Sequence, residues 1–389
     1  MAILLDAFKL EPEEAVKFFR QKGFEITFSW QDLWQEAHAK AFTVAGVMKM
    51  DILMDIRDAV DRAISEGKTF QEFKKEIEPI LQRKGWWGHD PVTDKWMGTL
   101  WRLRTIFATN ILSAYQAGRY WQMAAVAARR PYWQYLAVLD RKTRPSHARL
   151  HGRIFPANDP FWDHFYPPNG WNCRCHVRSL SRRELERYDL EDRVESSEGR
   201  LTTKTVPLSK RRGSTTEVVE FDGISPDPGF SSNPGKTVWR PNLDEYEREI
   251  AERYVTESLE GPDFERFFFG KSRGNFPVAI FAEEYKKAIE AKSQVVLLSD
   301  ESLAKNIKRH PELKIDDYRS LPQIIGDAHL VVQDGERTLV FYKRGNKIYY
   351  AVVKATKSRR TLFLTSFRLA SHSDVESIRK KGRIILDRL

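Results

Sequence analysis

Apolar residues recur at helical spacing through the first third of the chain. Thr69 and Glu72 form the pattern of a capping box at the start of one such segment. Glycines follow two of the segments, at positions where helices commonly end. This pattern predicts long helices over residues 29–67, 69–85 and 95–130.

The pattern changes at Tyr132, where the run YWQYLAVLD predicts a strand that ends at Asp140. Residues 141–175 are dense in turn formers, histidine and tryptophan, and they lack the periodicity of a packed element. A bound metal ion or tight loop packing must therefore hold this segment. Residues 188–241 are polar and rich in Gly, Pro and Ser, which predicts an irregular connection.

Regular periodicity is also found in the last third of the chain. A strand over residues 294–299 and a helix over 300–310 are expected there, and Arg344-Gly345-Asn346 is expected to join two later strands as a hairpin. The later strands are expected over residues 328–334, 337–343, 347–355 and 359–367.

At 389 residues the chain is too long for one ordinary core. We therefore expect a multidomain α+β protein with a mainly helical N-terminal module, an irregular Cys/His loop region and a small C-terminal α+β domain with a twisted antiparallel sheet. The expected boundaries are 1–130 for the helical region, 131–245 for the Cys/His loop and irregular connection, 246–276 for a helix and linker, and 277–389 for the C-terminal domain.

Composition excludes several classes of protein. Hydrophobic residues make up 41% of the chain and aromatic residues 12%, which is enough for packed cores. Two cysteines cannot form a disulfide framework, and no apolar run approaches the roughly 20 residues of a membrane helix. We expect a soluble protein of a reducing compartment with no membrane partner.

The net charge of +10 is uneven along the sequence. Residues 294–389 hold 19 Lys/Arg against 11 Asp/Glu, a surplus of eight. A basic C-terminal piece favours a partner that carries phosphates, and the alternative is an ordinary solvated basic face.

Both cysteines stand two residues apart in NCRC, so two thiolates on an extended segment would face the same side. With Asp140 and with His147 or His151, Cys173 and Cys175 could form a tetrahedral zinc site. A disulfide between residues so close would be strained. Two alternatives remain open: small buried cysteines beside histidines that bond loop carbonyls, and a catalytic Cys–His pair.

The segments DRKTRPSHARLHG and FWDHFYPPNGWNCRC resemble the signature of the phage Mu F-like minor head proteins, also called phage head morphogenesis proteins. The N-terminal PEEAVKFFRQKGF and the later DPGFSSNPG are similar to the same family, so the resemblance covers residues 1–245. It implies a head assembly protein near the portal and DNA entry, with portal and capsid proteins as partners, in the virion head and the host cytoplasm. Thr143 and Ser146 stand where related proteins have further thiols, so hydrogen bonds are the alternative to a structural zinc.

Residues 277–389 resemble the phage-borne nucleases of the barnase, EndoU, colicin and RelE superfamily, on the segments RHPEL, VVKAT and LTSF. The resemblance implies metal-independent cleavage of RNA, tRNA among the candidates, without a cofactor. His310 would be the base or acid, Lys354 would stabilise charge on the phosphorane, and Thr365 and Ser366 would donate hydrogen bonds.

Three further residues would bind the substrate: Lys343 and Arg360 would hold phosphates, and Tyr350 would stack a base. Each of these residues also has an ordinary explanation as a helix-end or surface residue. The alternative function is a purely structural head protein whose C-terminal domain binds packaged DNA or the portal without catalysis. An ADP-ribosyltransferase-like domain is a lesser alternative, since no Arg/Ser/Glu arrangement for NAD stands out.

Overall fold

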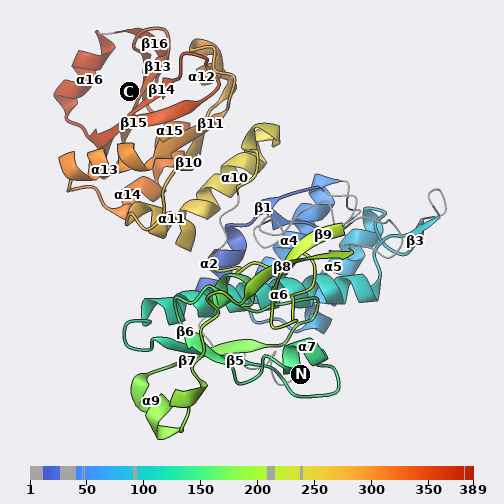
Figure 1. Cartoon of the computed structure of the whole chain (residues 1–389). Coiled ribbons are helices and arrows are strands. Elements are labelled where there is room, and N and C mark those ends of the chain that lie inside the picture. The colour runs from blue at the N-terminus through green and yellow to red at the C-terminus, as the bar shows by residue number, and fades with distance from the viewer. Residues whose placement is uncertain are drawn as a thin grey trace. The chain divides into compact units, whose positions relative to one another are not determined.

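The chain divides into two compact units, Met1–Pro241 and Asn242–Leu389, and each is described by itself (Figure 1). The computed structural model describes residues 12–26, 41–45, 47, 49–90, 94–207, 215–236, 240–380 and 382–389.

Helices form the described N-terminal part of the first unit. The capping box ahead of α5 is confirmed, because the backbone N–H of Thr69 donates to the Glu72 carboxylate at 2.7 Å and the Glu72 N–H donates back to the Thr69 hydroxyl. Gly85 follows α5 with a φ of +73°, a conformation that suits glycine at a helix end. The helices are α2 (Pro12–Arg20), α4 (Met50–Ser65), α5 (Phe70–Arg83) and α6 (Leu100–Ala125).

The helix expected over residues 29–67 is shorter than the pattern predicts. Strand β2 (Ala41–Phe42) pairs in parallel with β1 (Gly23–Phe24), and the helix begins only at Met50. Residues 29–40 of this prediction lie outside the described residues. A short apolar run fits a strand as well as a helix turn, which is why periodicity alone overextended the helix.

The helix expected over residues 95–130 also begins later than expected. Lys95–Trp96 form strand β4, which pairs with β3 (His89–Asp90). Helix α6 starts after Thr99, whose hydroxyl accepts a hydrogen bond from the Arg102 N–H. A local N-cap therefore fixes the start of α6, although the helical spacing of apolar residues continues towards the N-terminus of the chain.

A three-stranded antiparallel sheet with the order β6-β5-β7 follows α6. The strand expected to end at Asp140 is present as β5 but ends at Leu136. The strands are β5 (Tyr132–Leu136), β6 (Ile154–Pro156) and β7 (His176–Leu180), and the short helices are α7 (Pro145–Ala148), α8 (Phe161–His164), α9 (Arg182–Arg187) and η1 (Glu191–Arg193).

The region expected to be irregular, residues 188–241, contains a regular hairpin. Strand β8 (Leu201–Pro207) pairs in antiparallel register with β9 (Thr215–Phe221), and most β8 side chains are exposed. Thr and Val make up most of these two strands, a β-forming composition that the polar surroundings concealed.

The second unit is built on one seven-stranded sheet with the order β10-β11-β15-β14-β13-β12-β16. All neighbouring strands are antiparallel except β11 and β15, which are parallel, so the expected antiparallel sheet is in fact mixed. The strands are β10 (Asn275–Ile280), β11 (Val295–Ser299), β12 (Leu330–Gln333), β13 (Thr338–Arg344), β14 (Ile348–Ala355), β15 (Leu362–Leu369) and β16 (Arg383–Asp387).

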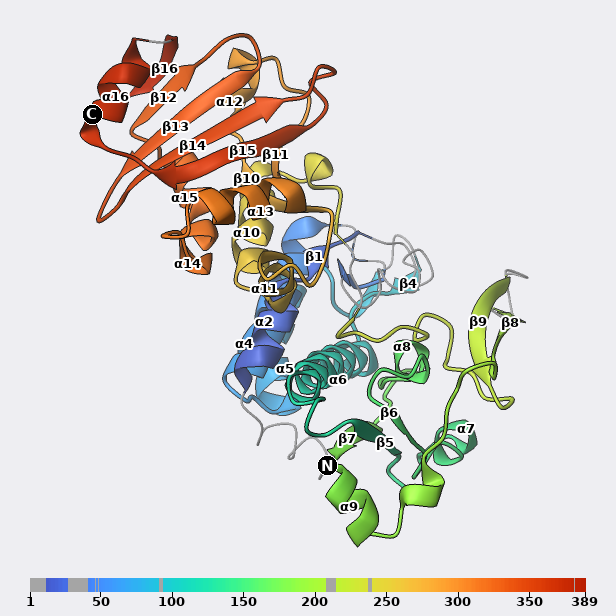
Figure 2. The same cartoon turned by 60° about the vertical axis from the view of Figure 1, so that its left-hand side comes forward.

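Helices cover this sheet unequally (Figure 2). Helices α10 to α15 share one large core with one face of the sheet, which we call the helix-covered face. Helix α16 places Val375 and Ile378 on the opposite face, beside Val332 and Tyr342. The helices are η2 (Leu243–Glu245), α10 (Arg248–Leu259), α11 (Pro262–Phe268), α12 (Glu283–Ala288), α13 (Asp300–Arg309), α14 (Ile315–Arg319), α15 (Leu321–Gly326) and α16 (His372–Arg379).

Residues 246–276, expected as a helix and linker, contribute to the core of the second unit. Tyr254 and Leu259 of α10 and Phe264 and Phe267 of α11 are buried in it. The protein is thus a mixed α/β chain with several sheets. Among the described residues, no helix combines the length and apolar character required to cross a membrane.

Candidate functional site

Three metal-ligating side chains meet beside the three-stranded sheet of the first unit. His147 lies in α7, where Pro145 occupies the first turn. Cys173 and Cys175 lie on the extended segment that leads into β7. Hydrogen bonds fix this segment, because Gln116 of α6 donates to the Cys175 carbonyl at 2.8 Å and the Cys173 N–H donates to the Gly170 carbonyl at 3.1 Å.

The three donor atoms are close together and shielded from water. His147 Nδ1 lies 3.6 Å from the sulfur of Cys173 and 3.6 Å from the sulfur of Cys175. All three side chains are at least 97% buried, and both cysteines are free thiols. Among the described residues, these three form the group that could hold a metal ion.

The environment separates the acidities of the two thiols. A hydrogen bond from the Cys175 thiol and the nearby His147 ring lower the pKa of Cys173 well below its usual value, although burial opposes this shift. The hydrogen bond to Cys173 and burial raise the pKa of Cys175 above its usual value. The two thiols therefore differ in acidity, and both are shielded from solvent.

Asp140 does not belong to this cluster, which corrects the expected four-ligand set. Its carboxylate accepts a hydrogen bond from Arg174 Nη1 at 2.6 Å and another from the Lys142 N–H at 3.0 Å. Arg174 lies between the two cysteines, so it projects to the other side of the segment and draws the carboxylate with it. Of the two candidate histidines, His147 joins the cluster, whereas His151 Nδ1 accepts a hydrogen bond from the Ala137 N–H at 3.1 Å.

An aromatic core surrounds the cysteines and accounts for much of the order in residues 141–175. Trp133 and Trp162 are fully or almost fully buried and lie 5.7 Å apart between ring centroids. Tyr120 contacts the rings of both Trp133 and Tyr166 edge-on. Loop packing, one of the two expected causes of order, is therefore present.

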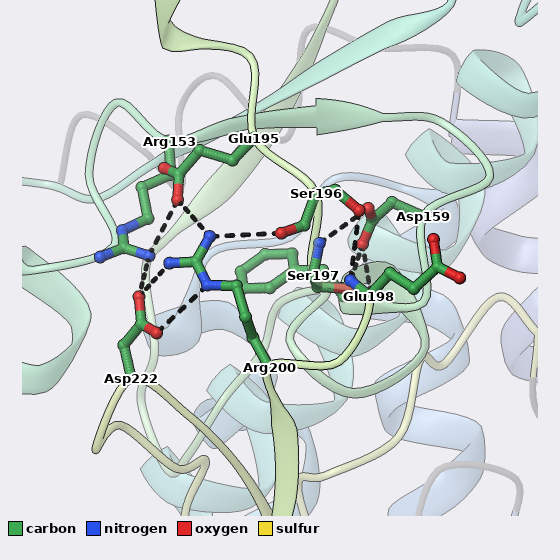
Figure 3. A network of polar contacts seen from close by, with 9 residues as sticks. Arg153, Asp159, Glu195, Ser196, Ser197, Glu198, Arg200 and Asp222 are labelled. Atoms are coloured by element: carbon green, nitrogen blue, oxygen red, sulfur yellow. Dashed lines mark hydrogen bonds and ion pairs between the residues drawn. The ribbon is translucent and has the colours of Figure 1, made fainter.

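A second polar cluster, which sequence reasoning missed, joins the loop before β8 to β6 (Figure 3). Arg153 donates to Asp222 at 2.7 Å and lies 3.3 Å from Glu195, and Arg200 donates to Glu195 at 2.9 Å. Both guanidinium groups lie over the Phe221 ring, at 5.0 and 4.5 Å from its centroid. Its members are scattered over 70 positions of a charge-rich sequence, so no local signal could have found it.

Asp159 anchors the same loop from the other side (Figure 3). Its buried carboxylate accepts hydrogen bonds from the Ser197 N–H at 3.1 Å and from the Phe161 N–H at 2.8 Å. These contacts fasten residues 195–200 to the aromatic core, which is a structural role.

The expected nuclease residues of the second unit do not converge on one site. His310 caps the end of α13, whose Leu303 packs into the helix-covered core, and its Nδ1 lies 3.3 Å from the Glu312 carboxylate. Lys354 lies between Val353 and Ala355, which face that core, so its exposed side chain leaves the sheet on the opposite face.

Thr365 and Ser366 lie at a β-bulge of β15. The register shifts there, Ser366 pairs with Val352, and the Thr365 hydroxyl donates to the Val352 carbonyl at 3.2 Å. The Thr365 hydroxyl is thus engaged within the sheet.

The three expected substrate-binding residues are also dispersed. Lys343 donates to the Asp327 carbonyl at 2.6 Å at the end of α15. Tyr350 lies on the opposite face of the sheet, where the Arg368 guanidinium is 4.3 Å from its ring centroid. Arg360 is exposed in the turn between β14 and β15.

The C-terminal basic surplus also depends on where the boundary is drawn. Residues 242–293, which belong to the same unit, hold 8 Lys/Arg and 12 Asp/Glu. Unit Asn242–Leu389 therefore holds 27 Lys/Arg against 23 Asp/Glu, a net charge of +4, and the other +6 of the net charge lies in the first unit. The charge is spread over both units.

The described residues define a two-unit α/β protein with a buried Cys/His cluster and no converged set of the expected nuclease residues. Residues 54–178, from α4 to β7, match the family described as Phage Mu protein F like protein. This match contains His147, Cys173 and Cys175.

Two relatives extend the similarity to most of the chain. "Putative capsid assembly protein F" of Escherichia phage Mu is 33% identical over 374 residues, which covers 86% of this chain and 84% of the relative. "Mu-like prophage FluMu F protein" of Haemophilus influenzae is 30% identical over 370 residues, with coverage of 84% and 89%. No solved structure matches the chain significantly. The chain belongs to the Phage Mu protein F-like family.

Proposed function

We propose that this protein is a structural component of phage head morphogenesis that acts in the host cytoplasm and in the assembling virion head. The observation that carries the proposal is the similarity to the phage Mu capsid assembly protein over more than four fifths of both chains. The arrangement of the described residues agrees with it, because the best-formed polar sites are buried or fasten loops and do not face a substrate.

The extent of the similarity favours a structural role for the second unit as well. The phage Mu relative leaves 14% of this chain unmatched, which is about 54 of 389 residues. Since the second unit has 148 residues, from 242 to 389, most of it is matched. A unit of which most is shared with a protein named "Putative capsid assembly protein F" is better explained as part of the assembly machinery than as an appended toxin.

Exposed apolar side chains near the start of α6 indicate one contact region for a head protein such as the portal or capsid protein. Of the eight large hydrophobic residues exposed in the described part of the chain, three lie within residues 96–101. Trp101 is 73% exposed and Trp96 is 67% exposed. Exposed tryptophans are costly in water and are enriched at protein interfaces.

The proposal is tested in the phage or prophage that encodes the chain. Deletion of the gene should abolish normal filled heads in electron micrographs of lysates, and the wild-type gene should restore them. Trp101→Ala should reduce restoration at least tenfold in infectious titre, whereas Tyr188→Ala, which truncates an aromatic residue that is 53% exposed elsewhere, should restore fully. Normal heads in the deletion strain would contradict the proposal.

Within this proposal, RNA cleavage and DNA binding are two alternative activities of the second unit. The separation of His310 from Lys354 argues against a shared cleavage site. The decisive assay incubates the full chain with total RNA, with His310→Ala as the control. Cleavage lost in the variant would establish the nuclease, and salt-sensitive DNA binding without cleavage would establish the DNA-binding alternative.

A further inference from the structure

We infer that His147, Cys173 and Cys175 bind one zinc ion, which fastens α7 to the segment before β7. This site is structural and independent of the proposed function. The distances between the donor atoms, their burial and the side-chain oxygen of Asn169, which is unpaired within the described part of the chain, support this site.

The spacing of the donor atoms matches a tetrahedral zinc site. Zinc binds thiolate sulfur at about 2.3 Å and imidazole nitrogen at about 2.0–2.1 Å, so a tetrahedral angle places nitrogen and sulfur about 3.6 Å apart. His147 Nδ1 lies 3.6 Å from each of the two sulfur atoms. All three donor atoms lie within 4.8 Å of one another, so one ion can contact all three groups.

Hydrogen bonds alone satisfy this arrangement less well. An imidazole Nδ1 carries either one proton or one lone pair, so it forms one well-directed hydrogen bond and not two. A disulfide is also unsuitable, because cysteines two residues apart would be strained and both are free thiols here. A single cation between the three groups would bind the His147 nitrogen and both sulfur atoms at the same time.

Burial favours an ion that neutralises the thiols. The cysteines are 3% and 2% exposed within the aromatic core, and His147 is 3% exposed. A buried isolated thiolate would be costly, whereas Zn²⁺ with two thiolates and a neutral imidazole carries no net charge. Two sulfur ligands select zinc over magnesium or calcium, which prefer oxygen.

A fourth ligand is supplied by water, since the donor group in the described residues has three members. Asn169 lies next to the cluster along the chain, because it precedes Gly170, whose carbonyl accepts a hydrogen bond from the Cys173 N–H at 3.1 Å. Its side-chain nitrogen donates to the Tyr135 hydroxyl at 3.0 Å, but its side-chain oxygen is buried without a hydrogen-bond partner among the described residues. A zinc-bound water would donate to that oxygen.

The first experiment measures metal in the full-length protein purified under reducing conditions from zinc-supplemented medium. We expect about one zinc per chain by elemental analysis. Cys173→Ser, Cys175→Ser and His147→Gln should each lower the content at least tenfold. Asp140→Asn and His151→Gln, which alter neighbouring residues outside the cluster, should keep it. Wild-type protein without metal, or equal loss in the Asp140→Asn control, would overturn the inference.

The second experiment needs no variant and holds even if the cysteine variants fail to fold. Replacement of zinc by Co²⁺ in the wild-type chain should produce the absorption of a tetrahedral cobalt–thiolate centre. Removal of the metal by a chelator should lower the midpoint of thermal unfolding and make both thiols reactive towards a thiol reagent. Absence of the cobalt spectrum, with thiols equally protected before and after chelation, would show that hydrogen bonds alone hold the cluster.

Discussion

At the scale of single residues, the two sides of the segment Cys173-Arg174-Cys175 face different surroundings. The cysteines turn into the aromatic core, and Arg174 turns outward to Asp140. Alternation along an extended backbone explains this division. The Arg174 side chain holds the pKa of Asp140 well below its usual value, so the carboxylate stays ionised and paired on the outside.

Close packing at Gly235 gives a prediction about stability. A Cβ atom at this position would lie 2.4 Å from Cδ1 and 2.6 Å from Cγ of Tyr120, whose ring is buried among Trp133 and Tyr166. Because that ring cannot move freely, Gly235→Ala should lower the free energy of unfolding by about 1–3 kcal/mol. Denaturant unfolding monitored by tryptophan fluorescence measures it. Ser232→Ala in the same loop is the matched control, and an equal effect of the two substitutions would contradict the packing argument.

At the scale of secondary structure, Glu184 links a helix cap to an ion pair. It completes the capping box of α9 with Ser181, and Arg130 donates to its carboxylate at 2.9 Å. The Arg130 side chain, followed by the Ser181 N–H, lowers the pKa of Glu184 to about 2 from an ordinary value of 4.5. Because the pKa of Glu184 is lower in the folded chain than in the unfolded chain, ionisation of its carboxyl group stabilises the fold. This stabilisation is fully present at a pH above the pKa of the unfolded chain and is lost as the pH falls towards 2.

Glu184→Gln should therefore destabilise the first unit at neutral pH by about 1 kcal/mol, a value kept small because the ion pair is partly exposed. The difference from wild type should shrink as the pH is lowered from 4.5 towards 2. Urea unfolding followed by circular dichroism at several pH values measures it. Glu186→Gln, an exposed position on the same helix, should have little effect at any pH. A difference that is independent of pH would contradict the assigned role of the carboxylate.

The elements that sequence reasoning found are those with strong local signals. The capping box at Thr69 fixed the start of α5, and β-branched runs located β11 and β13 to within a residue or two. Local patterns failed where pairing with a distant strand decides the structure. Phe276 looked like part of a linker, but β10 is a buried edge strand because β11 pairs with it.

The same limit applies to the candidate sites. His147, Cys173 and Cys175 were grouped by ligand type within one loop-rich segment, and the described structure brings the three side chains together. Asp140 was wrongly assigned to the cluster because its carboxylate pairs with Arg174, which lies between the two cysteines in the sequence. The nuclease residues were grouped by a loose resemblance, and sheet parity separates Lys354 from His310.

At the scale of the whole molecule, the boundary between the units decides which fragments can fold. The second unit begins at Asn242, and α10 and α11 fill its core with large apolar side chains. The buried apolar residues that these two helices contribute are Ile250, Ala251, Tyr254, Val255, Leu259, Phe264 and Phe267. Each large side chain stabilises the fold by about 1.5–3 kcal/mol when buried, so the six large ones contribute about 9–18 kcal/mol, as much as the roughly 5–15 kcal/mol stability of a typical domain.

We therefore expect residues 242–389 to fold as an isolated fragment and to unfold cooperatively in urea. Residues 277–389 should lack a cooperative transition and should give the poorly dispersed amide spectrum of an unfolded chain. Any assay of RNA cleavage or DNA binding by this part of the protein must use the longer fragment or the full chain, since inactivity of the shorter one would report only its failure to fold. A cooperative transition in residues 277–389 would show instead that α10 and α11 are dispensable, and would place the boundary of the second unit at the start of β10.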